Sequence, residues 1–350
     1  MIPYCLNLTN DPFIMKKNVF SAVLLVQFFL FQSAKAQVDP HFSEYYVYPS
    51  WLNPGLTGAI DGDYRLSAIY RNQWSGISNA FSTVGISGEL VTNKNINLGG
   101  SMLQQTAGEG GFTYLTANAS IAYTGIKFGK KGLQRIAVGF QAGIMQRRIN
   151  PSKFQLGDQW NPITGYNPNT VTSDVFTRTS STVLDAGAGA VYFDADPSKK
   201  ANIYFGVSAF HLTQPKDPFT SGASLQKIPI RYTMHGGVKL ALSETLSLTP
   251  NFLYLKQGSA EEKMLGAYAQ LQANDVTDLL LGGNYRFKDA ISPFVGFYYK
   301  SFVVGLSYDI NNSDLGKAAT TNTNSFEISI SFIGRKSKNF STEHFICPRL

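Results

Sequence analysis

Strict alternation of side-chain type near the end of the chain is the feature that most constrains its fold. From Phe302 to Ile310 an aromatic or aliphatic residue occupies every second position, and Asp309 stands in the other set. The run from Ser325 to Phe332 repeats the pattern, with Glu327 on its polar side. A period of two predicts a β-strand with one apolar face. Each run has about the 9–11 residues that a tilted strand needs to cross a bilayer. We therefore expect an outer-membrane β-barrel whose apolar face meets lipid.

The composition of the 350 residues agrees with this interpretation. Aromatic residues make up 13% of the chain and charged residues 15%, against about 25% charged in typical soluble domains. After residue 36 no stretch reaches the roughly 18 apolar residues of a membrane helix. Some secreted all-β proteins share this composition, so it supports the barrel without proving it.

The first 36 residues predict export. Lys16 and Lys17 follow Met15, the apolar run 19–31 comes next, and an A-x-A cleavage motif spans 34–36. This is the layout of a secretory signal peptide. We expect translation to start at Met15, with residues 1–14 as upstream sequence, and the mature chain to begin at Gln37. Cys347 is then the one cysteine of the mature chain, which predicts a free thiol or an intermolecular partner.

The mature chain divides into three parts. Residues 37–62 are rich in proline and aromatic residues and predict an irregular segment, either inside the barrel as a plug or under its periplasmic mouth. Residues 63–334 predict the barrel, and 335–350 a basic periplasmic tail. The expected strands are, to within a few residues, 63–72, 79–91, 95–106, 112–128, 133–147, 181–193, 201–212, 229–241, 245–256, 261–272, 278–288, 291–299, 302–311 and 324–334. The fold class is thus all-β, a transmembrane antiparallel barrel of about fourteen strands.

The lengths of the connections predict the orientation. The three longest, 148–180, 213–228 and 312–323, all fall on one side of the barrel, and short turns fall on the other. Outer-membrane barrels have short periplasmic turns and long extracellular loops. This places both termini in the periplasm. In the fourth strand, polar Asn118 and Ser120 share a parity with Phe112 and Tyr114, so which of its faces meets lipid stays open.

Charged residues of the barrel fall on the faces expected to point inward, because an Arg or Lys facing lipid costs about 2–4 kcal/mol at the midplane. A cationic lumen could select anions, or the charges could pair across the barrel, which we favour. The expected lumen set is Glu89, Arg147, Asp185, Arg231, His235, Lys239, Arg286, Asp309 and Glu327, with Arg65, Arg71 and Arg135 beside it.

Catalytic and cofactor motifs are absent from the sequence. No paired-cysteine, HExxH or EF-hand spacing occurs, and no glycine-rich phosphate loop, so we expect no metal and no cofactor. His235 with Asp185 or Glu327 is the only imaginable hydrolase constellation, and a hydrogen-bonded lumen histidine explains it better. Export argues against nucleic acid as a partner. We do not expect an enzyme.

Three short segments resemble the amino-terminal signature of the PorP/SprF family. They are Asp39-Pro40-His41-Phe42-Ser43, then Leu52-Asn53-Pro54-Gly55-Leu56-Thr57-Gly58, then Tyr70-Arg71-Asn72-Gln73-Trp74. Asn284-Tyr285-Arg286 with Asp289-Ala290-Ile291 is also similar. The resemblance implies a non-catalytic outer-membrane barrel of the type IX secretion and gliding systems. It further implies periplasmic lipoprotein and ring components as partners, or exported surface adhesins.

The tail favours the PorP-like branch and predicts a docking element. Its basic residues supply charge, its two phenylalanines supply anchors, and its cysteine could form an intermolecular disulfide. The expected docking residues are Arg335, Lys336, Phe340, Phe345, Cys347 and Arg349. A disordered end with an idle thiol is the alternative. Tyr70–Trp74 is either an interfacial strand end or a surface contact for an exported partner.

Two functions therefore stay open at the sequence level. The first is a docking barrel of the secretion machinery with protein partners on both faces. The second is a diffusion porin or small-molecule transporter with a cationic lumen.

Overall fold

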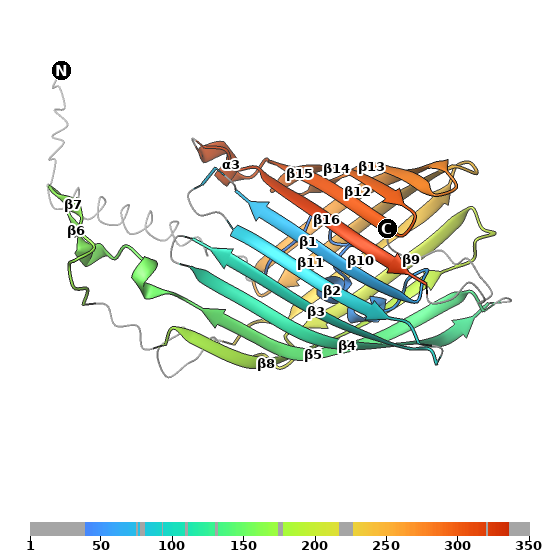
Figure 1. Ribbon diagram of the computed structural model, residues 1–350, viewed down its shortest axis with the longest axis horizontal. Helices are drawn as coiled ribbons and strands as arrows, with labels where there is room; N and C mark the ends of the chain where they lie inside the picture. The colour runs from blue at the N-terminus through green and yellow to red at the C-terminus, as the bar shows by residue number, and fades with distance from the viewer. Residues whose placement is uncertain are drawn as a thin grey trace, which may run out of the picture. The chain divides into compact units, whose positions relative to one another are not determined.

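The computed structural model describes residues 39–335, apart from residues 75, 78–80, 93, 109–110, 130–131, 174–177, 217–226 and 320. Within these residues fourteen antiparallel strands close into one barrel, in which β1 pairs with both β2 and β16 (Figure 1). The predicted all-β barrel is confirmed. The expected signal peptide and the tail from Lys336 onward lie outside the described residues.

The strands of the barrel follow the chain in order around the wall. They are β1 Tyr64–Gln73, β2 Phe81–Leu90, β3 Ile96–Ala107, β4 Phe112–Phe128, β5 Gln134–Arg148, β8 Ser180–Asp194, β9 Ala201–Phe210, β10 Arg231–Ala241, β11 Leu246–Gln257, β12 Ala260–Asn274, β13 Thr277–Arg286, β14 Ala290–Tyr299, β15 Phe302–Asn311 and β16 Ser325–Gly334. Each lies within three residues of its predicted bounds, because alternation is a local signal that needs no knowledge of the partner strand.

The two faces of each strand separate by polarity. On β15, Leu306 and Ile310 are each 48% exposed, whereas Asp309 is 2% exposed. The same holds on β16, where Ile328 points outward and Glu327 inward. β4 also turns its polar parity inward: Ser120 is buried with Tyr114, and Ile121 is exposed. The Tyr114 ring lies on the inner face of β4 because the barrel interior is packed with side chains.

The connection between β5 and β8 holds structure that the sequence did not predict. It contains the 3₁₀ turns η2 (Pro151–Lys153) and η3 (Gly157–Gln159) and a separate two-stranded sheet, β6 (Trp160–Asn161) with β7 (Gly165–Tyr166). A short helix, α3 (Asp314–Ala318), lies between β15 and β16. Among the described residues no helix is long and apolar enough to cross a membrane.

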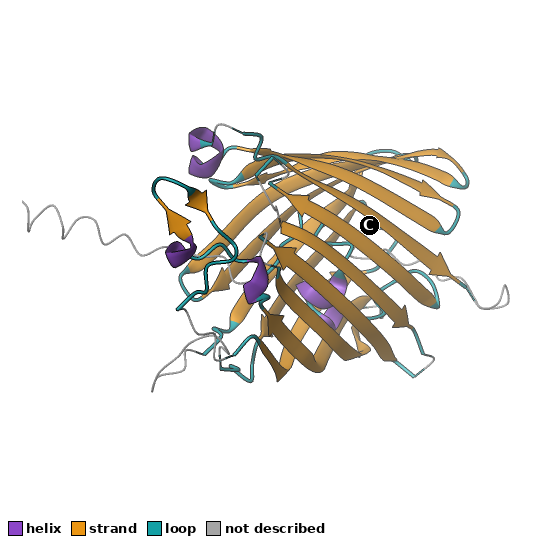
Figure 2. Ribbon diagram, turned by 60° about the vertical axis from the view of Figure 1, so that its left-hand side comes forward, coloured by secondary structure: helices purple, strands orange, loops and turns teal. Residues whose placement is uncertain are grey.

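Residues 39–62, called here the inner segment, run through the barrel interior before β1 begins. They include α2 (Pro49–Leu52) and η1 (Pro54–Leu56), drawn in purple within the orange strands in Figure 2. One end of the barrel carries the connections 149–179, 211–230 and 312–324 and is called the long-loop end; the other is the short-turn end. Asp39 bonds to His211 at the long-loop end, and Asp63 bonds to Gly334 at the short-turn end. The first and last described residues, Asp39 and Arg335, thus lie at opposite ends of the barrel, and the termini themselves lie outside the described residues.

Candidate functional site

An ion network joins the start of the inner segment to the wall. Arg71 of β1 pairs with Glu327 of β16 and, at 2.8 Å, with Asp309 of β15. Arg286 of β13 pairs with the same Asp309 at 2.7 Å. Ser43 stands at the centre: its hydroxyl donates to Asp309 at 2.7 Å and its backbone N–H to Glu327 at 2.5 Å. All these charges are buried, and buried charges persist only when paired and hydrogen-bonded.

Glu44 is the carboxyl group of the inner segment with the least favourable surroundings. Its Oε2 accepts a hydrogen bond from Ser329 at 2.5 Å, and its backbone N–H donates to Glu327 at 3.0 Å. The side chain is 1% exposed, and Oε1 has no hydrogen-bond partner among the described residues.

A second ion cluster, at the long-loop end, joins Asp39 of the inner segment to three further strands or their ends. His211 reaches it at 2.8 Å and Arg231 at 3.0 Å, and the second ring nitrogen of His211 lies 2.7 Å from Asp185. Burial alone would raise the pKa of Asp39, but the charges of His211 and Arg231 lower it well below its usual value. The Arg231 guanidinium also lies 4.7 Å from the Trp51 ring and donates to the Trp51 carbonyl at 2.6 Å. This cluster joins β8, β9 and β10 to the segment.

The turn Asn53-Pro54-Gly55 rests on a glycine surface of the wall. Asn53 Nδ2 donates to the carbonyls of Ala190 and Val207, each at 3.1 Å, while its Oδ1 accepts from Gly55 N at 2.9 Å. A Cβ at Gly139 would overlap the Pro54 carbonyl, and one at Gly189 would overlap the Asn53 side chain. The turn can approach β5 and β8 this closely only because these wall positions lack side chains.

The end of the inner segment is held by β2, β3 and β4. The Gly58 N–H donates to Glu89 at 2.8 Å, and Glu89 pairs with Arg65 at 3.0 Å. Gly58 has a φ of 70°, and a Cβ there would collide with Asn97. Only glycine fits such a position without strain. Thr57 Oγ1 lies 3.0 Å from Ser120 Oγ.

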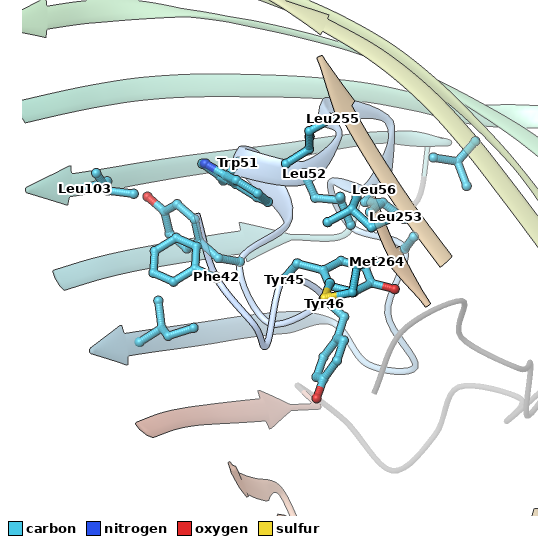
Figure 3. Close-up of a cluster of buried hydrophobic side chains, with 14 of the residues drawn as sticks. Phe42, Tyr45, Tyr46, Trp51, Leu52, Leu56, Leu103, Leu253, Leu255 and Met264 are labelled. Atoms are coloured by element: carbon cyan, nitrogen blue, oxygen red, sulfur yellow. The ribbon is translucent and has the colours of Figure 1, made fainter. Parts of the chain in front are cut away.

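Apolar packing fills the space between these polar anchors. Phe42 is fully buried and meets the Tyr48 and Trp51 rings edge-on at 5.9 and 5.7 Å (Figure 3). Tyr46 packs against Phe294, and Tyr45 donates to Asn251 at 2.9 Å. With the contacts above, the segment touches every strand of the barrel. The residues of the wall that complete this set are Tyr268, Asn284 and Ser292.

The three expected signature segments meet in this site, each through part of its residues. Arg71 reaches His41 at 3.1 Å and Ser43 at 3.2 Å, so the first and third signature segments are in contact, and the second forms the turn on the glycine surface. Gln73 is buried, and Asn72 lies opposite Phe326 in the register of β1 and β16. Tyr70 faces outward, and its ring packs against the Phe326 ring. Trp74 directly follows the strand and has a φ of 60°.

Several expected lumen charges lie elsewhere on the inner wall. Lys239 donates to Gln270 at 2.9 Å, and the Arg147 guanidinium lies 5.8 Å from the Phe112 ring. His235 contacts Asn53 at 3.2 Å. The acids imagined for it are engaged otherwise, Asp185 by His211 and Glu327 by Arg71, so the hydrolase constellation is wrong.

The described part of the chain, 39–335 with its gaps, holds no group of three or more His, Cys, Asp or Glu placed to bind a metal. Of the expected docking residues, Arg335 pairs with Asp61 at 2.9 Å at the short-turn end. Lys336, Phe340, Phe345, Cys347 and Arg349 lie outside the described residues.

Sequence reasoning missed Asp39, Glu44 and His211 as site residues. Asp39 lies within the quoted signature, which was a usable signal. Glu44 and His211 carry no local pattern, because their partners are 285 and 172 positions away. The glycine surface had a signal too, namely glycines at the inward parity of β5 and β8.

The fold and the site define a membrane β-barrel whose interior is occupied by its own amino-terminal segment. Residues 34–332 match the family described as type IX secretion system membrane protein PorP/SprF, and the chain belongs to this family. It is an outer-membrane component of that system, and proteins of this family and fold are typically not enzymes. None of the curated proteins compared matches the chain.

Solved structures similar to the chain are also barrels, at low identity. The Ralstonia pickettii toluene transporter TbuX has 9% identity and a TM-score of 0.46, with 81% of this chain and 92% of that chain covered. The KdgM porin has 6% identity and a TM-score of 0.37, with 77% and 98% covered. CdiB from Acinetobacter baumannii has 9% identity and a TM-score of 0.41, with 77% and 59% covered.

Proposed function

We propose that this protein is a non-catalytic docking barrel of the type IX secretion and gliding machinery, which binds periplasmic components at one face and exported proteins at the other. The observation that carries the proposal is the inner segment, which contacts all fourteen strands from within. A barrel filled in this way works through its two ends rather than through its bore.

The pairing of the inward charges supports the same conclusion. Arg65, Arg71, Arg231 and Arg286 each have a buried carboxylate partner at 3.0 Å or less. Cations neutralised in this way contribute little field to attract anions. The diffusion porin therefore ranks second.

Affinity purification from native outer membranes in mild detergent tests the docking proposal. We would compare the wild type, a deletion of residues 336–350 and Cys347→Ser. The proposal expects periplasmic secretion components to co-purify with the wild type and to be lost with the deletion. Loss with Cys347→Ser as well would mean a covalent link. If nothing co-purifies with the wild type, the docking proposal fails.

Planar bilayers test the porin alternative on the same preparations. The docking barrel should show little or no stable conductance while residues 39–62 are in place. Large, stable conductance of the intact wild type would favour the porin.

A further inference from the structure

The inner segment has a direction. Its first described residue, Asp39, bonds to His211, which directly follows β9, and to Arg231, which opens β10. Both lie at the long-loop end. At the other limit the backbone N–H of Asp63 donates to the carbonyl of Gly334, the last residue of β16, at 2.9 Å. That pair lies at the short-turn end.

The contacts between these limits follow the same overall order, although the segment folds back at Trp51, whose ring N–H donates to the Pro40 carbonyl at 2.8 Å. Ser43 meets Asp309 and Arg286, which are among the last residues of β15 and β13 at the long-loop end. Asn53 meets Ala190 and Val207 within the wall. Gly58 then meets Glu89, near the short-turn end of β2. The segment therefore crosses the barrel once, from the long-loop end to the short-turn end, before the first strand begins.

Together with the predicted cleavage before Gln37, this single pass indicates at which end of the barrel the mature chain starts. The expected first residue after signal-peptide cleavage, Gln37, is two residues before Asp39, and two residues span at most about 7 Å. We propose that the mature protein displays its amino terminus at the long-loop mouth of the barrel, on the face opposite to its carboxyl-terminal tail.

One consequence follows. Resting on the proposed function, the amino terminus and the long loops form the face toward exported proteins, and the region after Arg335 forms the face toward periplasmic components.

Cysteine labelling on whole cells tests the display. In a Cys347→Ser background, Val38→Cys reports the amino terminus. Ile163→Cys reports the long-loop end, because Ile163 is 92% exposed and lies beside β6. Val276→Cys reports the short-turn end, because Val276 is 44% exposed and lies between β12 and β13. A membrane-impermeant maleimide is added to intact and to permeabilised cells, and heat-dependent gel migration verifies that each barrel is folded.

The proposal expects Val38→Cys to label on intact cells together with Ile163→Cys, while Val276→Cys labels only after permeabilisation. Labelling of Val38→Cys together with Val276→Cys would overturn it, and so would labelling only after denaturation. If Val276→Cys labels on intact cells and Ile163→Cys does not, the orientation behind the proposed function is wrong. Even then, the single pass stands if Val38→Cys follows Ile163→Cys.

Discussion

Replacing Gly139 by alanine should loosen the inner segment without touching its own residues. The added Cβ would overlap the carbonyl group of Pro54 and approach the backbone N–H of Gly55, so backbone rather than a flexible side chain must move. Overpacking of this kind costs about 1–3 kcal/mol. The movement would also stretch the two Asn53 hydrogen bonds to the wall, each contributing about 1 kcal/mol. We expect a total loss of about 2–4 kcal/mol.

The control is Gly100→Ala on β3. The only neighbour of its ideal Cβ is the Asn118 carbonyl oxygen at 3.9 Å, so it adds the same methyl group to the outer face without a collision. It should leave the docking of the segment unchanged.

The assay is single-channel recording in planar bilayers, combined with proteolysis of the inner segment in detergent. At about 1.4 kcal/mol per factor of ten, the open fraction of Gly139→Ala should rise about 30- to 1,000-fold over Gly100→Ala, with a matching rise in cleavage. Equal behaviour of the two variants would refute the argument that the glycine surface holds the segment.

A further outcome follows from the charges. Arg71→Met should lower the free energy of unfolding by about 3–5 kcal/mol, because it leaves Glu327 buried without its cation. Chemical denaturation in lipid vesicles measures this change. The control is Lys263→Ala, which removes an exposed ion pair, and an equal effect of the two variants would contradict the prediction.

Local pattern predicted the wall of this barrel well. The alternation of side chains within each strand predicts which face meets lipid, as exposed Leu306 and buried Asp309 illustrate. A charge on the lipid face is costly whatever strand lies beside it. The short turns and long loops were likewise visible from length alone.

The interior was much less predictable. The sequence showed an aromatic, proline-rich segment but not whether it lay inside the barrel or beneath it. It showed Arg71 and Asp309 as inward residues but not that they share Ser43, because that contact joins positions 266 residues apart.

The sequence by itself therefore determined the fold class, the strands, their two faces and the family to which the chain is similar. Only the tertiary structure decided the path of residues 39–62, the ion network at Ser43 and the glycine surface under Asn53. The physical reason is that the alternation of side chains is a property of each single strand. These contacts join distant parts of the chain and form only once the barrel has closed. Closing the barrel brings the first and last strands side by side around one interior.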